Sequence, residues 1–88
     1  LTEGSLPDAM EQQITKEILS VKGINDVHSL KTRRNGPCII LSMHIVVAPT
    51  MTVEQAHNIT VEAEKTIRKS FGDNTQISIH VEPSCDAQ

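Results

Sequence analysis

The chain has 88 residues, a formal net charge of −3 and a single aromatic residue, a phenylalanine. This length allows one domain with a modest core, and small domains of this kind often gain stability from a metal, a disulfide or a partner chain. The negative charge argues against a general nucleic-acid binder, because contacts with phosphates need an excess of lysine and arginine.

The first predicted element is an amphipathic helix. Leu6-Pro7-Asp8 is typical of a helix start, because proline is tolerated in the first turn and an aspartate there suits the helix dipole. Apolar residues at near-helical spacing then predict a helix over residues 8–21, with Gly23 as its C-terminal stop. The residues that set this spacing are Met10, Ile14, Ile18 and Val21.

Two strands are predicted next, over residues 24–34 and 38–48. Asn35-Gly36 between them is the strongest short signal for a hairpin. One face of the second strand is continuously apolar and is expected to pack on the helices, whereas the other is mixed and accessible. The apolar face comprises Ile39, Leu41, Met43, Ile45 and Val47, and the mixed face comprises Ile40, Ser42, His44 and Val46.

A second helix is predicted over residues 53–71, because Thr52-Val53-Glu54-Gln55 is a capping box. Its expected buried stripe comprises Val53, Ala56, Thr60, Ala63, Ile67 and Phe71. A third strand follows over residues 75–82 and ends at Pro83. The predicted fold is therefore α+β, a small two-layer α-β-β-α-β domain with two helices on one face of a three-stranded sheet.

The candidate functional residues are the four histidines and one carboxylate: His28, His44, His57, His80 and Glu82. Side chains two apart in a strand share a face, so His80 and Glu82 point the same way, away from the apolar set of their strand. They converge with His44 if the second and third strands lie near each other, and with His28 if the first strand pairs with the second. Imidazoles and a carboxylate are a ligand set for a borderline divalent metal.

Each histidine alone is weak evidence, because a single histidine in a strand is more often a hydrogen-bonded surface residue. His57 lies in the predicted helix and can simply cover the seam between helix and sheet. To join the others it needs a special geometry, such as reach around a sheet edge or into a partner subunit. The set as a whole therefore predicts metal binding, with His57 the member that needs most explanation.

Other chemistries are not favoured, and the protein is not expected to be an enzyme. A histidine with a glutamate can act as acid and base, but no nucleophile elbow, glycine-rich phosphate loop or H-E-x-x-H pattern accompanies them. The basic residues Lys31, Arg33 and Arg34 could meet acidic lipid headgroups or an acidic partner, or form a solvated strand end.

The two cysteines and the ends of the sequence carry less information. Cys38 and Cys85 form no C-x-x-C motif, and reduced thiols in the cytosol are the simpler interpretation. Cys85, near Glu82, is either a soft metal ligand or a tail residue. No signal peptide or membrane span is visible. Because the chain begins with Leu1 and not methionine, it is expected to be part of a longer protein that could hold membrane segments elsewhere.

These motifs resemble the cytoplasmic C-terminal domain of cation diffusion facilitator transporters, the cation efflux family. The resemblance covers nearly the whole chain, and the phrases around His57 and His80 are its most specific part. It is carried by Leu6-Pro7-Asp8, Val21-Lys22-Gly23-Ile24, Val27-His28-Ser29-Leu30-Lys31-Thr32-Arg33, Met43-His44-Ile45, Thr52-Val53-Glu54-Gln55-Ala56-His57 and Ile79-His80-Val81-Glu82-Pro83.

The resemblance implies a metallochaperone-like domain that dimerises below six transmembrane helices, at the cytoplasmic face of a membrane. Residues 1–7 would then lead in from a membrane segment, residues 8–83 would form the regulatory metal-binding domain, and residues 84–88 would be a tail. Membrane helices encoded upstream would exclude a soluble metallochaperone, which the lack of paired cysteines already disfavours.

By the same resemblance, a regulatory site near the dimer interface is formed by His28, His44, His57, His80 and Glu82. Metal there is expected to draw the two lobes together and favour the transport-competent state, with zinc expected first and iron or manganese as alternatives. The chain departs from the family at two positions. Family members often have an aspartate where this chain has Ser29, and some have a polar residue where it has Val81. Both departures put the coordination number of the metal in doubt. A metal-independent dimerisation or interaction module is the alternative function.

Overall fold

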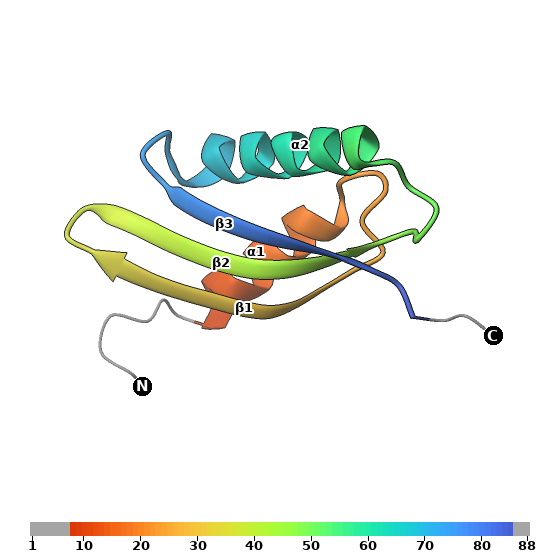
Figure 1. Ribbon diagram of the computed structural model, residues 1–88. Helices are drawn as coiled ribbons and strands as arrows, with labels where there is room; N and C mark the ends of the chain where they lie inside the picture. Colours follow the sequence, from red (N-terminus) through yellow and green to blue (C-terminus); the bar gives the residue numbers. More distant parts are fainter. Residues whose placement is uncertain (1–7, 86–88) are drawn as a thin grey trace.

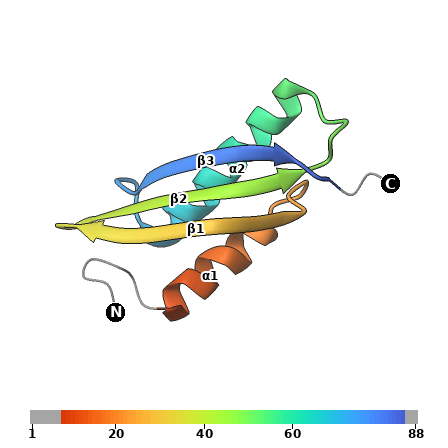
Figure 2. The ribbon, with the colours of Figure 1, turned by 60° about the horizontal axis from the view of Figure 1, so that its bottom comes forward.

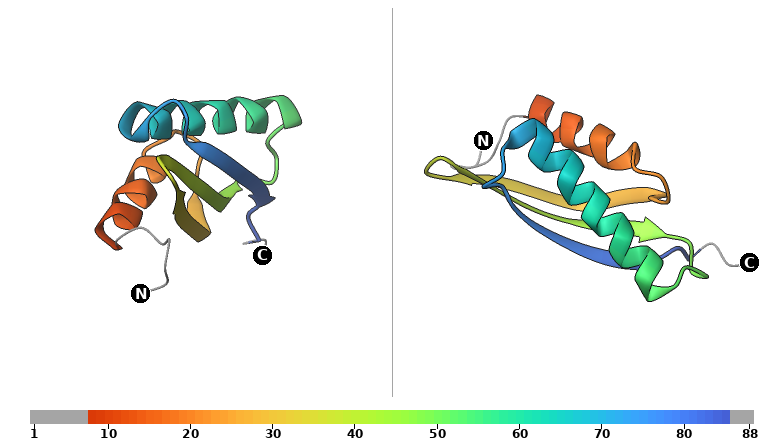
Figure 3. Two further views of the ribbon diagram at one scale, coloured as in Figure 1. Left: turned by 90° about the vertical axis from the view of Figure 1, so that its left-hand side faces the viewer. Right: turned by 90° about the horizontal axis from the view of Figure 1, so that it is seen from above.

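The three strands form one sheet with both helices on the same face, as seen in a computed structural model that describes residues 8–85 (Figure 1). The elements are α1 (Asp8–Leu19), β1 (Asp26–Asn35), β2 (Cys38–Val47), α2 (Val53–Phe71) and β3 (Gln76–Pro83). In the view from above both helices lie on the near side of the sheet (Figure 3, right), and the view with the bottom turned forward shows the opposite side open (Figure 2). This confirms the predicted two-layer α-β-β-α-β fold.

The strand order is β1-β2-β3, with β1 antiparallel to β2 and β2 parallel to β3. A parallel pair needs a crossover connection, and α2 provides it between β2 and β3. Within residues 8–85 no helix is both long and apolar enough to cross a membrane. The predicted lead-in over residues 1–7 and the last three residues of the predicted tail lie outside the described part of the chain.

The apolar face of β2 forms the centre of the core, as predicted. All five of its residues are buried against two isoleucines of α1 and two residues of α2, which are Ile14, Ile18, Ala63 and Ile67. The prediction that Val53 belongs to the buried stripe of α2 is wrong, since its side chain is 88% exposed. Val53 is the first residue of α2, and the start of this helix extends past the edge of the sheet (Figure 2).

The hairpin turn lies one residue later than predicted. Asn35 pairs with Cys38, so Gly36 and Pro37 are the two central turn residues, and Gly36 has a φ of 62°. A turn centred on Asn35-Gly36 would put Pro37 in the ladder, where it has no N–H to donate. With Gly36 first, only one residue needs a positive φ, and the proline ring suits the position that follows.

Several further boundaries differ from the predictions by one or two residues, and β3, for example, covers Gln76–Pro83 instead of residues 75–82. Helix α1 ends at Leu19 instead of residue 21, because Val21 N–H already bonds to the Ile18 carbonyl in a tight turn (3.1 Å). This turn leads to Gly23, whose φ of 100° ends the helical path as expected for a glycine stop. Strand β1 consequently starts at Asp26 and not at residue 24.

Candidate metal centre

Three histidines lie side by side on the open face of the sheet, one from each strand. The register pairs His28 of β1 with His44 of β2, and His44 with His80 of β3. The ring centroids of His28 and His44 are 5.2 Å apart, and those of His44 and His80 are 4.7 Å apart. Both conditions set for convergence, the pairing of the first two strands and the adjacency of the last two, are therefore met.

The carboxylate of Glu82 lies between two of these imidazoles. Its Oε1 is 2.9 Å from His28 Nε2 and its Oε2 is 2.6 Å from His44 Nδ1, so each oxygen accepts a hydrogen bond when that nitrogen carries a proton. One ligand atom from each of the three residues lies within 4.8 Å of the others. Glu82 thus joins the ends of β1, β2 and β3 into one cluster of nitrogen and oxygen donors.

A β-bulge in β1 sets the position of His28. The pairing shifts between His28 and Lys31, and Ser29 has a φ of 57°. The bulge lets His28 and Lys31 both face away from the helices, although they are three residues apart. Ser29 Oγ also lies 3.1 Å from His28 Nδ1, where its hydroxyl can donate and leave the Nε2 proton directed at Glu82. The sequence has neither glycine nor proline at this bulge, so no local pattern predicts it.

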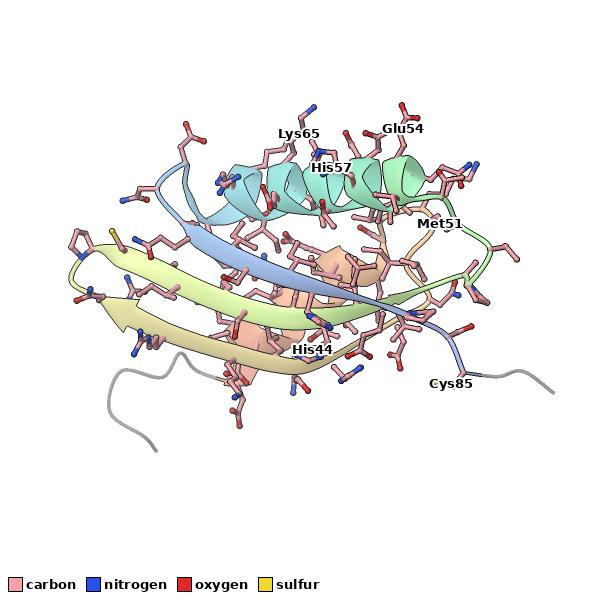
Figure 4. All side chains as sticks on the ribbon, viewed as in Figure 1. His44, Met51, Glu54, His57, Lys65 and Cys85 are labelled. Atoms are coloured by element: carbon pink, nitrogen blue, oxygen red, sulfur yellow. The ribbon has the colours of Figure 1, made fainter. Side chains whose placement is uncertain are left out.

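Two candidate ligands lie away from the cluster. His57 is exposed on α2, in the helical layer, whereas His44 lies on the opposite side of the sheet (Figure 4). Cys85 is an exposed free thiol after the end of β3, and it does not belong to the group of converging donors found within residues 8–85. One chain therefore brings together His28, His44 and Glu82, with His80 beside them, but not His57.

The donor set fits a divalent metal of intermediate softness. A tetrahedral zinc site with bonds near 2.1 Å places its ligand atoms about 3.4 Å apart, so small side-chain rotations suffice to close the cluster around an ion. His28, His44 and Glu82 would hold the metal, and His80 lies where it can supply a further imidazole. Binding must displace the protons shared with Glu82, which makes the affinity dependent on pH.

Hydrogen bonds from His44 and His28 lower the pKa of Glu82 below its usual 4.5. A carboxylate with a lowered pKa in the folded state stabilises the fold above the unfolded pKa, and this contribution is lost as the pH falls through the lowered value.

We therefore expect Glu82→Gln to flatten the decline in the free energy of unfolding of the metal-free domain below about pH 4.5. Urea denaturation over an acid pH series measures this, with Glu62→Gln on α2 as the control. A decline as steep in Glu82→Gln as in the wild type would contradict the expectation.

The fold and the cluster agree with a match to the family model described as the cation efflux protein, cytoplasmic domain, over residues 6–84. The chain belongs to this family, which is defined by the transport of cations and not by catalysis. It is 32% identical over 83 residues to the cation-efflux pump FieF of Pectobacterium atrosepticum, and 30% identical over 84 residues to metal tolerance protein C1 of Arabidopsis thaliana. These alignments cover 94% and 96% of the chain but only 27% and 18% of the two relatives.

Solved structures of the same domain superpose closely. The zinc form of CzrB is 33% identical, with a TM-score of 0.81 and coverage of 99% of both chains. A nickel form of a MamM CTD variant is 25% identical, with a TM-score of 0.82 and coverage of 90% of this chain and all of that one. The expectations of fold, family and cytoplasmic location are confirmed by these matches.

Proposed function

We propose that this chain is the metal-sensing regulatory domain of a divalent-cation efflux transporter and that it works as a homodimer. The observation that supports this most directly is the carboxylate of Glu82 held between His28 and His44, with His80 alongside. Family membership supports a membrane-embedded transport part in the same polypeptide, because the relatives are several times longer than this chain.

Zn²⁺ is the first candidate ion, with Fe²⁺ or Mn²⁺ as alternatives, and the ligand types alone suit Zn²⁺ and Fe²⁺ about equally. Imidazole nitrogen suits zinc and iron, whereas manganese prefers a larger share of oxygen donors than one carboxylate provides. The zinc form of CzrB and the nickel form of the MamM CTD variant are compatible with a site for divalent ions in such domains. The five proposed ligands are His28, His44, His57, His80 and Glu82.

His57 is proposed to act across the dimer. Its side chain is exposed and makes no hydrogen bond within residues 8–85, so it is free to meet a second copy of the chain. A metal held by the cluster of one protomer and by the partner's histidine would bind the closed arrangement better than the open one. Metal then shifts the population toward the closed dimer by its difference in affinity for the two states.

Small-angle scattering of the domain with and without Zn²⁺, Mn²⁺ and Fe²⁺ tests this proposal. We expect a dimer whose radius of gyration falls with at least one of the ions and returns when a chelator is added. An identical dimer with or without chelator would support the alternative, in which the domain is a metal-independent dimerisation module of the same kind of transporter.

A further inference from the structure

A second polar row lies directly beside the histidine row on the open face of the sheet. The register aligns Lys31 of β1 with Ser42 of β2, and Ser42 with Ser78 of β3. All three side chains face away from the helices, since the residue next to each of them in its strand packs on the helical side: Thr32, Leu41 and Ile77. The two rows border a surface hollow of about 570 Å³, whose lining includes Ser29, Lys31, Ser42, Ser78, His44 and His80.

The side chains of this second row have free hydrogen-bonding capacity. Within residues 8–85, Lys31 makes no ion pair, and the hydroxyls of Ser42 and Ser78 have no hydrogen-bond partner. Among the residues of the described range, 8–85, no carboxylate lines the hollow. An ammonium group and two hydroxyls can all donate hydrogen bonds, so the row offers donors toward whatever occupies the hollow.

The charge balance of the neighbouring row favours an anion there. One carboxylate and neutral imidazoles leave a divalent ion with one uncompensated positive charge, and Lys31 adds another. Positions two apart in a strand are about 6.7 Å apart, so an anion in the Lys31 row would lie close to both charges. A hollow lined with donors beside a positively charged centre has the character of an oxyanion site.

We propose that this hollow binds a tetrahedral oxyanion of the phosphate class next to the bound metal. The Lys31 ammonium and the hydroxyls of Ser42 and Ser78 donate hydrogen bonds to the oxyanion, while the metal held by the adjacent row supplies long-range attraction. The inference rests on the proposed function, because the site is complete only with metal. Linkage is reciprocal, so phosphate raises metal affinity by the same factor as metal raises phosphate affinity.

Phosphorus NMR of inorganic phosphate with the Co²⁺-loaded domain tests the proposal. Co²⁺ takes the same donors as Zn²⁺ and is paramagnetic, so phosphate bound in the hollow should show a broadened signal that a Zn²⁺-loaded sample does not give. We expect Lys31→Gln with Ser42→Ala to weaken phosphate binding about tenfold, because hydrogen bonds to a charged group are lost. Visible absorption of Co²⁺, measured without phosphate, should be unchanged in this variant.

Lys22→Gln with Ser20→Ala is the matched control, since it removes the same two functional groups from a surface near the end of α1. Equal phosphate binding by both variants would overturn the oxyanion site. Absence of a Co²⁺ absorption band in the wild type would instead overturn the proposed metal site, and the inference with it. A parallel titration with glycerol 3-phosphate tells whether the site takes the inorganic anion or also a phosphate ester. If only the signal of inorganic phosphate broadens, the site is specific for the inorganic anion. If the signals of both compounds broaden, the site also accepts esters.

Discussion

Replacing His80 and Glu82 together with alanine is expected to lower the affinity of the domain for Zn²⁺ by at least about 100-fold, because even the loss of groups that only support metal ligands costs 10- to 100-fold. Within the described part of the chain Glu82 contributes the only carboxylate of the cluster, and its two oxygens contact both His28 and His44. Its loss removes one negative charge and also the group that orients two imidazoles. Isothermal titration calorimetry of the wild type and the double variant measures the difference.

The double variant is informative because its positions are not part of the core. The side chain of His80 is exposed and that of Glu82 is about one-third exposed, so neither substitution opens a cavity among the buried residues. Glu62→Ala removes a more exposed carboxylate from α2, away from the open face of the sheet, and should leave Zn²⁺ binding as in the wild type. Unchanged Zn²⁺ affinity in the double variant would refute the assignment of these residues.

Much of the fold follows from local patterns in the sequence. The strict alternation in β2 predicts correctly which face is buried, because side chains of a strand point alternately to its two sides. The start of α2 is equally well defined, since Thr52 accepts a hydrogen bond from the backbone of Gln55 while the Gln55 side chain accepts one from the Thr52 backbone. Both signals depend only on neighbours within a few residues.

The arrangement of the candidate site depends on long-range pairing, which no local pattern specifies. Parity predicts the face that carries His80, but the alignment of His80 with His44 depends on β3 lying parallel beside β2. The position of His28 depends in turn on the bulge at Ser29, a residue type that rarely adopts a positive φ. The sequence therefore predicts a set of candidates, and the sheet register determines which of them meet.

His57 separates the two proposed functions most sharply. The imidazole lies on α2 and the cluster lies on the other side of the sheet, so a single chain cannot use both for one ion (Figure 4). If His57 is a ligand, its bond to the metal exists only in the closed dimer. Conversion of a mostly open dimer to a mostly closed one, from 1:99 to 99:1, needs a difference in affinity of about 10⁴-fold. A metal–imidazole bond made only after closure is a direct source for that difference.

We therefore expect His57→Ala to retain Zn²⁺ binding at the cluster formed by His28, His44 and Glu82 but to lose the metal-dependent decrease in radius of gyration. Scattering and calorimetry on the same samples distinguish binding from closure, and the variant should bind more weakly than the wild type because the closed state no longer contributes. Asn58→Ala, at the next exposed position of α2, is the control and should close like the wild type. If Zn²⁺ closed the His57→Ala dimer as far as the wild-type dimer, the partner's histidine would not be the group that couples the two lobes. The metal-dependent contact would then have to come from the open face of the sheet.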